Sequence, residues 1–245
     1  MKKISVCLAS YNGERYIRQQ IDSIMPELSA DDELIVSDDG STDSTLSIVA
    51  SYKDQRITVL RGRKFGSAIR NFENALNHAT GDYIILADQD DVWLPGRVSK
   101  IRSKFNDYDL IVCDCKIVDQ NLVAVKPSYF EVVNARPGML RNMIRTSPFI
   151  GCCMAFSRKL LKLSLPFPTD IPMHDFWIAM LAEARFRILF YDEPLVLYRR
   201  HDSNLSATGS NSKYSLMKKI GFRINLLKAL LPRLLLKRHD SGQNA

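Results

Sequence analysis

The first part of the chain alternates short β-branched runs with longer segments of helical periodicity, and this alternation limits the fold more than any other feature. Between the runs, apolar residues recur with the spacing of one helix face. Such alternation is typical of a parallel sheet with crossover helices. We therefore predict an α/β fold with a Rossmann-like, mixed but mainly parallel central sheet and flanking helices, whose first strands are Ile4–Ala9, Glu33–Ser37, Ile57–Leu60 and Asp82–Ala87.

The second part of the chain has a looser pattern, in which proline-punctuated loops separate shorter apolar runs. A turn at Asp119–Asn121 lies between two apolar runs and indicates a hairpin. Some strand pairing here is therefore expected to be antiparallel. The predicted elements are helices over Arg97–Phe105 and His174–Ala184 and strands over Leu110–Cys113, Cys152–Phe156, Arg187–Tyr191 and Leu195–Tyr198.

The net charge of +7 is confined to the end of the chain. Residues 1–202 are neutral, whereas the remainder carries eight basic residues against one acidic residue, which accounts for the whole surplus. From Lys213 to Arg238 most apolar residues fall on one side of a helical wheel, and Pro232 is expected to kink or divide the helix. This basic amphipathic tail suits an anionic membrane surface. The alternatives are packing on the preceding domain or on a partner chain.

Composition also indicates which cellular compartment and which class of partner to expect. The chain has no stretch of about 20 uncharged apolar residues, so we do not expect a spanning helix. Its five cysteines are an odd number and lie mostly in strand-like runs, which favours packing roles in a reducing, cytoplasmic environment. The tail is rich in leucine and lacks interleaved aromatic residues, which favours lipid over nucleic acid.

Polar residues follow three of the predicted parallel strands directly, in the stretches Ser10–Gly13, Asp38–Ser41 and Asp88–Asp91. Ligands of open parallel sheets bind beyond the carboxyl ends of the strands, so these stretches should converge on one site. Three carboxylates within Asp88–Asp91 repel one another unless a cation or protonation relieves them. Oxygen ligands suit Mg²⁺ or Mn²⁺. The alternative is a solvated acidic loop or helix cap.

The stretch Asp38–Asp43 is open to two interpretations. Gly40 permits a positive φ and the following residues can cap a helix, which would make the motif structural. An acidic residue at this sheet edge can also accept hydrogen bonds from a nucleotide. The sequence has neither a Gly-x-Gly-x-x-Gly motif nor a phosphate loop with Gly-Lys-Ser, so redox dinucleotides and simple ATP hydrolysis are disfavoured.

The ordered motifs resemble those of the bacterial family 2 glycosyltransferases, which have a nucleotide-diphosphosugar transferase fold of the GT-A type. The resemblance covers most of residues 3–204 and rests on the segments Ser5–Gly13, Ser37–Asp43, Gly81–Tyr83 and Leu86–Trp93. It implies that Tyr11 and Asp39 contact the donor base. It also implies that Asp88 contacts the ribose or the metal, and that Asp90 is the principal ligand of Mn²⁺ or Mg²⁺. Ser10, Asn12 and, more weakly, Arg70 complete the expected donor site.

The resemblance places the catalytic base in the stretch Met173–Trp177, which has His174 where the family usually has an acidic residue. Asp175 is then the expected base, with His174 orienting it or contacting the acceptor. The alternatives are that Asp175 stabilises a helix N-terminus and that Trp177 is a core residue rather than a sugar platform.

The polar residues after the last predicted strand are candidates for the donor diphosphate. In similar enzymes a late histidine or arginine closes over the diphosphate, so His201 is a candidate metal ligand and Arg199 or Arg200 a phosphate clamp. An exposed basic loop is the alternative.

Together with the motifs, the resemblance implies a metal-dependent, inverting transferase that moves a hexose (glucose, galactose, N-acetylhexosamine or rhamnose) from a UDP- or dTDP-sugar. The resemblance implies a lipid-linked saccharide acceptor in O-antigen or surface polysaccharide synthesis, at the inner face of a bacterial plasma membrane. The expected organisation is a catalytic domain over residues 1–204, with a nucleotide-sugar half (1–91) and an acceptor half (92–204), and a membrane-associating tail over 205–245. Alternatives are a sugar-phosphate nucleotidyltransferase, a phosphoacceptor signalling module and a non-catalytic basic binding protein on the same fold.

Overall fold

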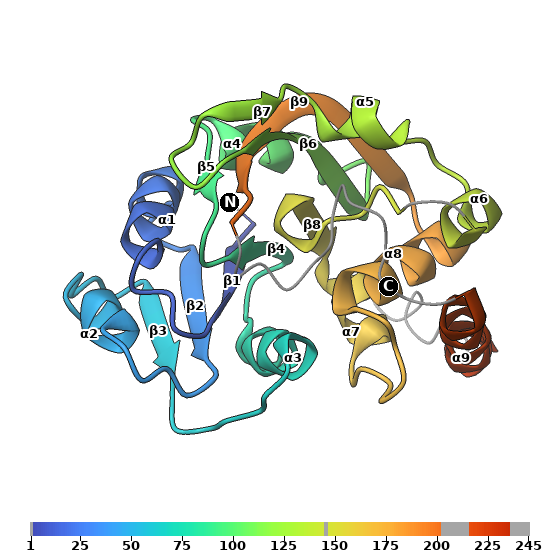
Figure 1. The fold of residues 1–245 in the computed structure, drawn as a ribbon, viewed down its shortest axis with the longest axis horizontal. Coiled ribbons are helices and arrows are strands. Elements are labelled where there is room, and N and C mark those ends of the chain that lie inside the picture. Colours follow the sequence, from blue (N-terminus) through green and yellow to red (C-terminus); the bar gives the residue numbers. More distant parts are fainter. Residues whose placement is uncertain (1, 145–146, 202–215, 236–245) are drawn as a thin grey trace, which may run out of the picture.

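The computed structural model describes residues 2–144, 147–201 and 216–235. Within these ranges one sheet of nine strands forms the core, in the order β3-β2-β1-β4-β8-β6-β9-β5, with β7 paired to β6. Helices pack beside this central sheet (Figure 1). The structure confirms the predicted mixed α/β fold.

The first half of the sheet is parallel, as the alternating pattern predicted. Its strands β1 and β4 are almost entirely buried, which explains why their sequences read as continuous apolar runs rather than alternating ones. The strands are β1 (Ile4–Ser10), β2 (Glu33–Asp38), β3 (Ile57–Leu60) and β4 (Tyr83–Asp88), and the intervening helices are α1 (Ile17–Ile24), α2 (Thr45–Ala50) and α3 (Ala68–His78).

The second half is mixed, as expected, but its strand boundaries differ from the prediction. The two strands predicted at Arg187–Tyr191 and Leu195–Tyr198 are one continuous strand, β9 (Ile188–Arg199), parallel to β6 (Leu110–Val118). The register between them shifts at Asp114, so β9 continues past the polar residues that suggested a loop. The remaining strands are β5 (Val92–Trp93), β7 (Ala124–Lys126) and β8 (Met154–Ser157), which follows a 3-10 turn, η2 (Gly151–Cys153).

Short helices cover this half. The predicted helix at Arg97–Phe105 is α4 (Arg97–Arg102), and the one at His174–Ala184 is α8 (His174–Arg185). Three others were not predicted: α5 (Tyr129–Val133), α6 (Met139–Ile144) and α7 (Arg158–Ser164).

The tail contains helix α9 (Leu216–Leu235), which lies beside α8 (Figure 1). Leu226 and Leu230 are buried against the domain, and the Arg223 guanidinium donates to the Met143 carbonyl at 2.7 Å. Pro232 was expected to kink or divide the helix; it does not divide it, because α9 continues through Pro232 to Leu235. Among the described helices, none is long and apolar enough to cross a membrane.

Gly81, which precedes β4, allows a close backbone approach that any side chain would block. A Cβ atom there would lie 2.6 Å from the Ser5 nitrogen and 2.8 Å from the Lys3 oxygen. We expect Gly81→Ala to lower the free energy of unfolding by ~1–3 kcal/mol through overpacking, measured by urea denaturation. Gly221→Ala is the control, because no atom lies within 4 Å of a Cβ there. Equal stability of the two variants would contradict the prediction.

Candidate active site

The carboxyl ends of β1, β2 and β4 lie side by side, as expected for neighbouring parallel strands. Ser10 pairs with Asp38, and Ala9 pairs with Asp88. The three polar stretches that follow these strands therefore border one edge of the sheet.

Hydrogen bonds hold the Ser10–Gly13 stretch after β1 against the loop after β2. The Ser10 hydroxyl donates to the Asp38 carboxylate at 3.1 Å, and the Asn12 side-chain oxygen accepts from the Thr42 amide at 2.8 Å. Tyr11 is 50% exposed, so its ring is available to a ligand.

Gln89, whose role was not predicted, holds the backbone of Tyr11 at both polar atoms. Its Oε1 accepts from the Tyr11 amide at 2.8 Å, and its Nε2 donates to the Tyr11 carbonyl at 3.0 Å. The Asp88–Asp91 stretch therefore positions Tyr11 as well as supplying carboxylates.

Asp39 and Arg70 both have partners within the chain. The buried Asp39 carboxylate accepts from the backbone amides of the loop before α3, including those of Gly66 at 3.1 Å and Ser67 at 3.2 Å. Arg70 forms an ion pair with Glu73 at 2.5 Å. Asp39 therefore shapes the wall of the site between β2 and α3.

Asp90 and His201 meet across the site, although they lie far apart in the sequence. The His201 Nε2 is 2.7 Å from the Asp90 Oδ2, and both side chains are largely buried. The ring of Tyr16, at the start of α1, stacks on His201 with centroids 4.9 Å apart. An imidazole nitrogen and a carboxylate oxygen at this separation are suitable ligands for Mn²⁺.

Arg199, predicted as a phosphate clamp, is buried and holds the Asp90 loop instead. Its Nε donates to the Asp90 carbonyl at 2.6 Å, and its Nη1 donates to the Gln120 carbonyl at 2.7 Å. Only 2% of the residue is exposed. Its hydrogen bonds therefore orient the Asp90 backbone, whereas the neighbouring Arg200 is half-buried and contacts the Tyr198 hydroxyl at 3.4 Å.

Asp175 lies in the first turn of α8, where its Oδ2 accepts from the Gly151 amide at 3.1 Å. Burial raises the pKa of Asp175 to about 6. Burial and the nearby charges of Asp90 and Asp175 raise the pKa of Asp88 to about 8. The structure thus brings together three carboxylates from two distant segments, and their mutual repulsion favours a bound cation.

His174 and Trp177 lie in the same helix as Asp175, and both are buried. His174 is 5% exposed and stacks on Phe72 with ring centroids 4.1 Å apart, and burial lowers its pKa to about 3. Within the described part of the chain, neither of its ring nitrogens has a hydrogen-bond partner, so no hydrogen bond from His174 orients Asp175. Trp177 is fully buried and donates its indole N–H to the Ser164 carbonyl at 3.0 Å, which makes it a core residue.

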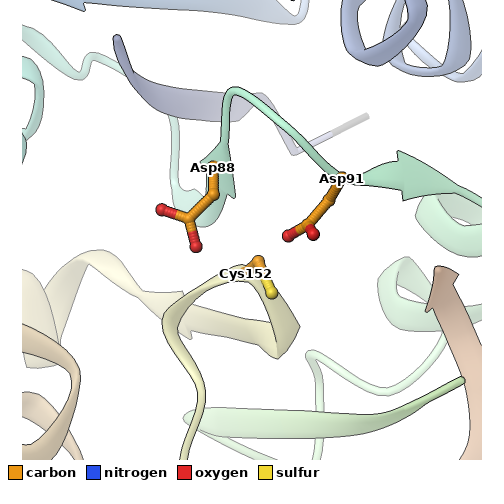
Figure 2. A group of neighbouring side chains, drawn as sticks. All are labelled: Asp88, Asp91 and Cys152. Carbon is orange, nitrogen blue, oxygen red and sulfur yellow. The ribbon is translucent and has the colours of Figure 1, made fainter. Parts of the chain in front are cut away.

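A second group, of Asp88, Asp91 and Cys152, lies beside the first and was not predicted (Figure 2). Its ligand atoms lie within 4.8 Å of one another. Asp91 belongs to a motif that the sequence singled out, but nothing near Cys152 in the sequence indicates this contact.

Solved glycosyltransferases share this fold. The S. aureus TarS structure in complex with UDP superposes with a TM-score of 0.69 at 21% identity, over 96% of this chain and 67% of that chain. A mannosyltransferase from Pyrobaculum calidifontis, in complex with GDP-Man and Mn²⁺, superposes with a TM-score of 0.63 at 21% identity, over 84% of this chain and 59% of that chain.

Sequence comparison identifies relatives and a family. The dTDP-rhamnosyl transferase RfbG of Shigella flexneri is 28% identical over 80% of this chain and 72% of its own length. The Escherichia coli enzyme WfgD, a UDP-Glc:alpha-D-GlcNAc-diphosphoundecaprenol beta-1,3-glucosyltransferase, is 26% identical over 83% of this chain and 79% of its own length. The profile of Glycosyl transferase family 2 matches residues 5–164. The chain therefore belongs to glycosyltransferase family 2 and is a glycosyltransferase.

Proposed function

We propose that this chain is a divalent-metal-dependent, inverting hexosyltransferase that uses a UDP- or dTDP-sugar and a lipid-linked saccharide acceptor. The main observation that supports this proposal is the contact of Asp90 with His201 at 2.7 Å, beside the carboxylates of Asp88 and Asp175. The names of the relatives support rhamnose or glucose as the hexose and a diphosphoundecaprenol-linked saccharide as the acceptor. Such an acceptor supports a place in O-antigen or similar surface polysaccharide synthesis.

Asp90 and His201 would hold Mn²⁺ or Mg²⁺, and the mixed oxygen and nitrogen ligands favour Mn²⁺. When bound, the ion stabilises the negative charge of the departing nucleotide diphosphate. Tyr11, exposed at the end of β1, would stack on the base, while Asp88 would accept from the ribose. Arg200, beside His201, would contact a phosphate.

Asp175 would accept the proton of the acceptor hydroxyl as that oxygen attacks the anomeric carbon. Its raised pKa suits a general base, because a stronger base takes up a proton more readily. A single displacement of this kind inverts the anomeric configuration and needs no covalent nucleophile.

Calorimetric titration with UDP, dTDP and GDP, each with and without Mn²⁺, tests the proposal without requiring the acceptor. We expect tight binding of UDP or dTDP only when Mn²⁺ is present. A folded protein that binds none of these nucleotides would overturn the proposal and favour a non-catalytic binding protein.

Gly13 gives Gln89 the room to hold Tyr11, because a Cβ atom on Gly13 would lie 2.2 Å from the Gln89 Oε1. We expect Gly13→Ala to weaken Mn²⁺-dependent nucleotide binding by about 10-fold, the effect of losing two hydrogen bonds of ~1 kcal/mol or less each. In a Gln89→Ala background the clash is gone, so the same substitution should have little further effect on the Kd. Additive effects of the two substitutions would contradict this explanation.

We also propose that α9 lies on an anionic membrane surface, at the inner face of the plasma membrane. Its side chains Ile224, Leu227, Leu231 and Leu235 are exposed on one side, opposite the buried Leu226 and Leu230. Leu227→Glu with Leu231→Glu should abolish flotation with phosphatidylglycerol vesicles and leave nucleotide binding unchanged. Equal flotation of this variant and the wild type would contradict the proposal.

A further inference from the structure

The group formed by Asp88, Asp91 and Cys152 combines two carboxylates with a thiol at the end of β4. One ligand atom from each residue lies within 4.8 Å of the other two, and Figure 2 shows the three side chains gathered between the end of β4 and the η2 turn. Asp91 and Cys152 are fully buried, whereas Asp88 is only partly buried and is accessible to an ion from solvent.

Asp91 has one buried oxygen without a partner outside this group. Its Oδ1 accepts from the Arg199 amide at 2.9 Å. Its Oδ2 is buried, and apart from its interaction with the Cys152 thiol it has no hydrogen-bond partner among the described residues. A buried carboxylate oxygen with no other partner is costly, and a cation would satisfy it.

The charges around the group leave room for a divalent cation. The buried Arg97 guanidinium donates to the Cys152 carbonyl at 2.5 Å and contributes one positive charge. Two carboxylates and a thiolate would contribute three negative charges, and Asp90 and Asp175 add further negative charge beside Asp88. Arg97 alone does not offset this charge, and a divalent ion would reduce it. The thiol would release its proton to solvent as the metal–sulfur bond forms.

We propose that Asp88, Asp91 and Cys152 form a second metal site, selective for a thiophilic divalent cation such as Zn²⁺ and distinct from the Asp90–His201 site. Zn²⁺ binds thiolate at about 2.3 Å and carboxylate at about 2.0 Å, so it would draw the three ligand atoms closer together. Since Asp88 serves both this site and the proposed donor site, Zn²⁺ here would block donor binding. This inhibitory role rests on the proposed function, whereas the metal site itself does not.

Cobalt titration of the full chain without nucleotide tests the site directly, because thiolate bound to Co²⁺ gives a charge-transfer band in the near ultraviolet. The wild type should show this band at one equivalent and lose it when Zn²⁺ is added. Cys152→Ser should abolish the band and weaken Zn²⁺ binding by at least about 100-fold, since even losing an outer-shell partner costs about 10- to 100-fold. The matched control Cys7→Ser removes a buried thiol outside the group and should keep the band.

A band that persists in Cys152→Ser, or is missing from the wild type, would overturn the proposal. Should the serine variant fail to fold, Asp91→Asn tests the same site with the thiol retained, and unchanged Zn²⁺ affinity would overturn it. Mn²⁺-dependent nucleotide binding is measured separately and should survive in Cys152→Ser. Its absence from the wild type would count against the proposed function alone.

Discussion

Replacing Asp90 by alanine should abolish the dependence of nucleotide binding on Mn²⁺. The Asp90 carboxylate lies 2.7 Å from the His201 imidazole, and the two are the proposed metal ligands. Asp90→Ala leaves only the imidazole of this pair. We expect the Kd for UDP or dTDP in the presence of Mn²⁺ to rise by about 100-fold, because the loss of even an outer-shell partner lowers metal affinity by about 10- to 100-fold and Asp90 is the proposed direct ligand. Calorimetry with and without Mn²⁺ measures the effect.

Asp82→Asn is a matched control, because Asp82 lies next to the opposite end of β4, is exposed and accepts from the Lys3 amide. This variant should bind nucleotide like the wild type. His201→Ala should weaken the metal dependence less than Asp90→Ala, since it keeps the carboxylate. Tight, Mn²⁺-dependent binding by Asp90→Ala would rule out Asp90 as the principal ligand.

The parallel half of the fold was predictable because its signals are local. Strands β1, β2 and β4 are largely buried, whereas the short β3 is only partly buried. Helices α1 and α3 each have one buried apolar face of their own. The second half depends on distant pairing: the register shift opposite Asp114 lets β9 run through Asp192 and Glu193, two polar residues that suggest a loop when read alone.

In the site, too, features with local signals were predictable, and contacts between distant segments were not. The strand-end carboxylates were predictable because the ends of adjacent parallel strands meet at one edge. The burial of Arg199 beneath the Asp90 loop was not, because it depends on Gln19 and Gln120, which are remote from it in sequence. The contact of Cys152 with Asp91 likewise arises only when η2 is placed beside β4.

Replacing Asp175 by asparagine should reduce turnover by about 10²–10⁴-fold while leaving nucleotide affinity nearly unchanged, because general-base catalysis contributes that much. Asparagine keeps the size of the side chain and an oxygen for the Gly151 amide, but it cannot take up the acceptor proton. Turnover with a saturating acceptor and calorimetry with nucleotide separate the two effects. A fully active variant would refute the role of base.

The pH dependence of the wild type gives a second test of the same residue. With the pKa of Asp175 raised to about 6, turnover should fall below that pH, by up to about tenfold per pH unit, as the base becomes protonated. A cation bound nearby moves this limb to lower pH, because positive charge favours the carboxylate. A rate that rises as the pH falls from about 7 to 4.5 would exclude a carboxylate base, because protonation of a base can only lower the rate.

The same pKa shift predicts that Asp175→Asn stabilises the fold. A carboxyl whose pKa is higher in the folded state than its ordinary 3.8 binds its proton more tightly when folded, so ionising it costs stability above about pH 6. That cost shrinks as the pH falls from about 6 to 3.8 and disappears below about pH 3, where the group is protonated in both states. The Tm of Asp175→Asn should therefore exceed that of the wild type at about pH 7.5, with a gain that decreases steadily as the pH falls toward about 4. An inactive variant with a lower Tm at pH 7.5 would indicate that structural damage, rather than a missing base, caused the loss of turnover.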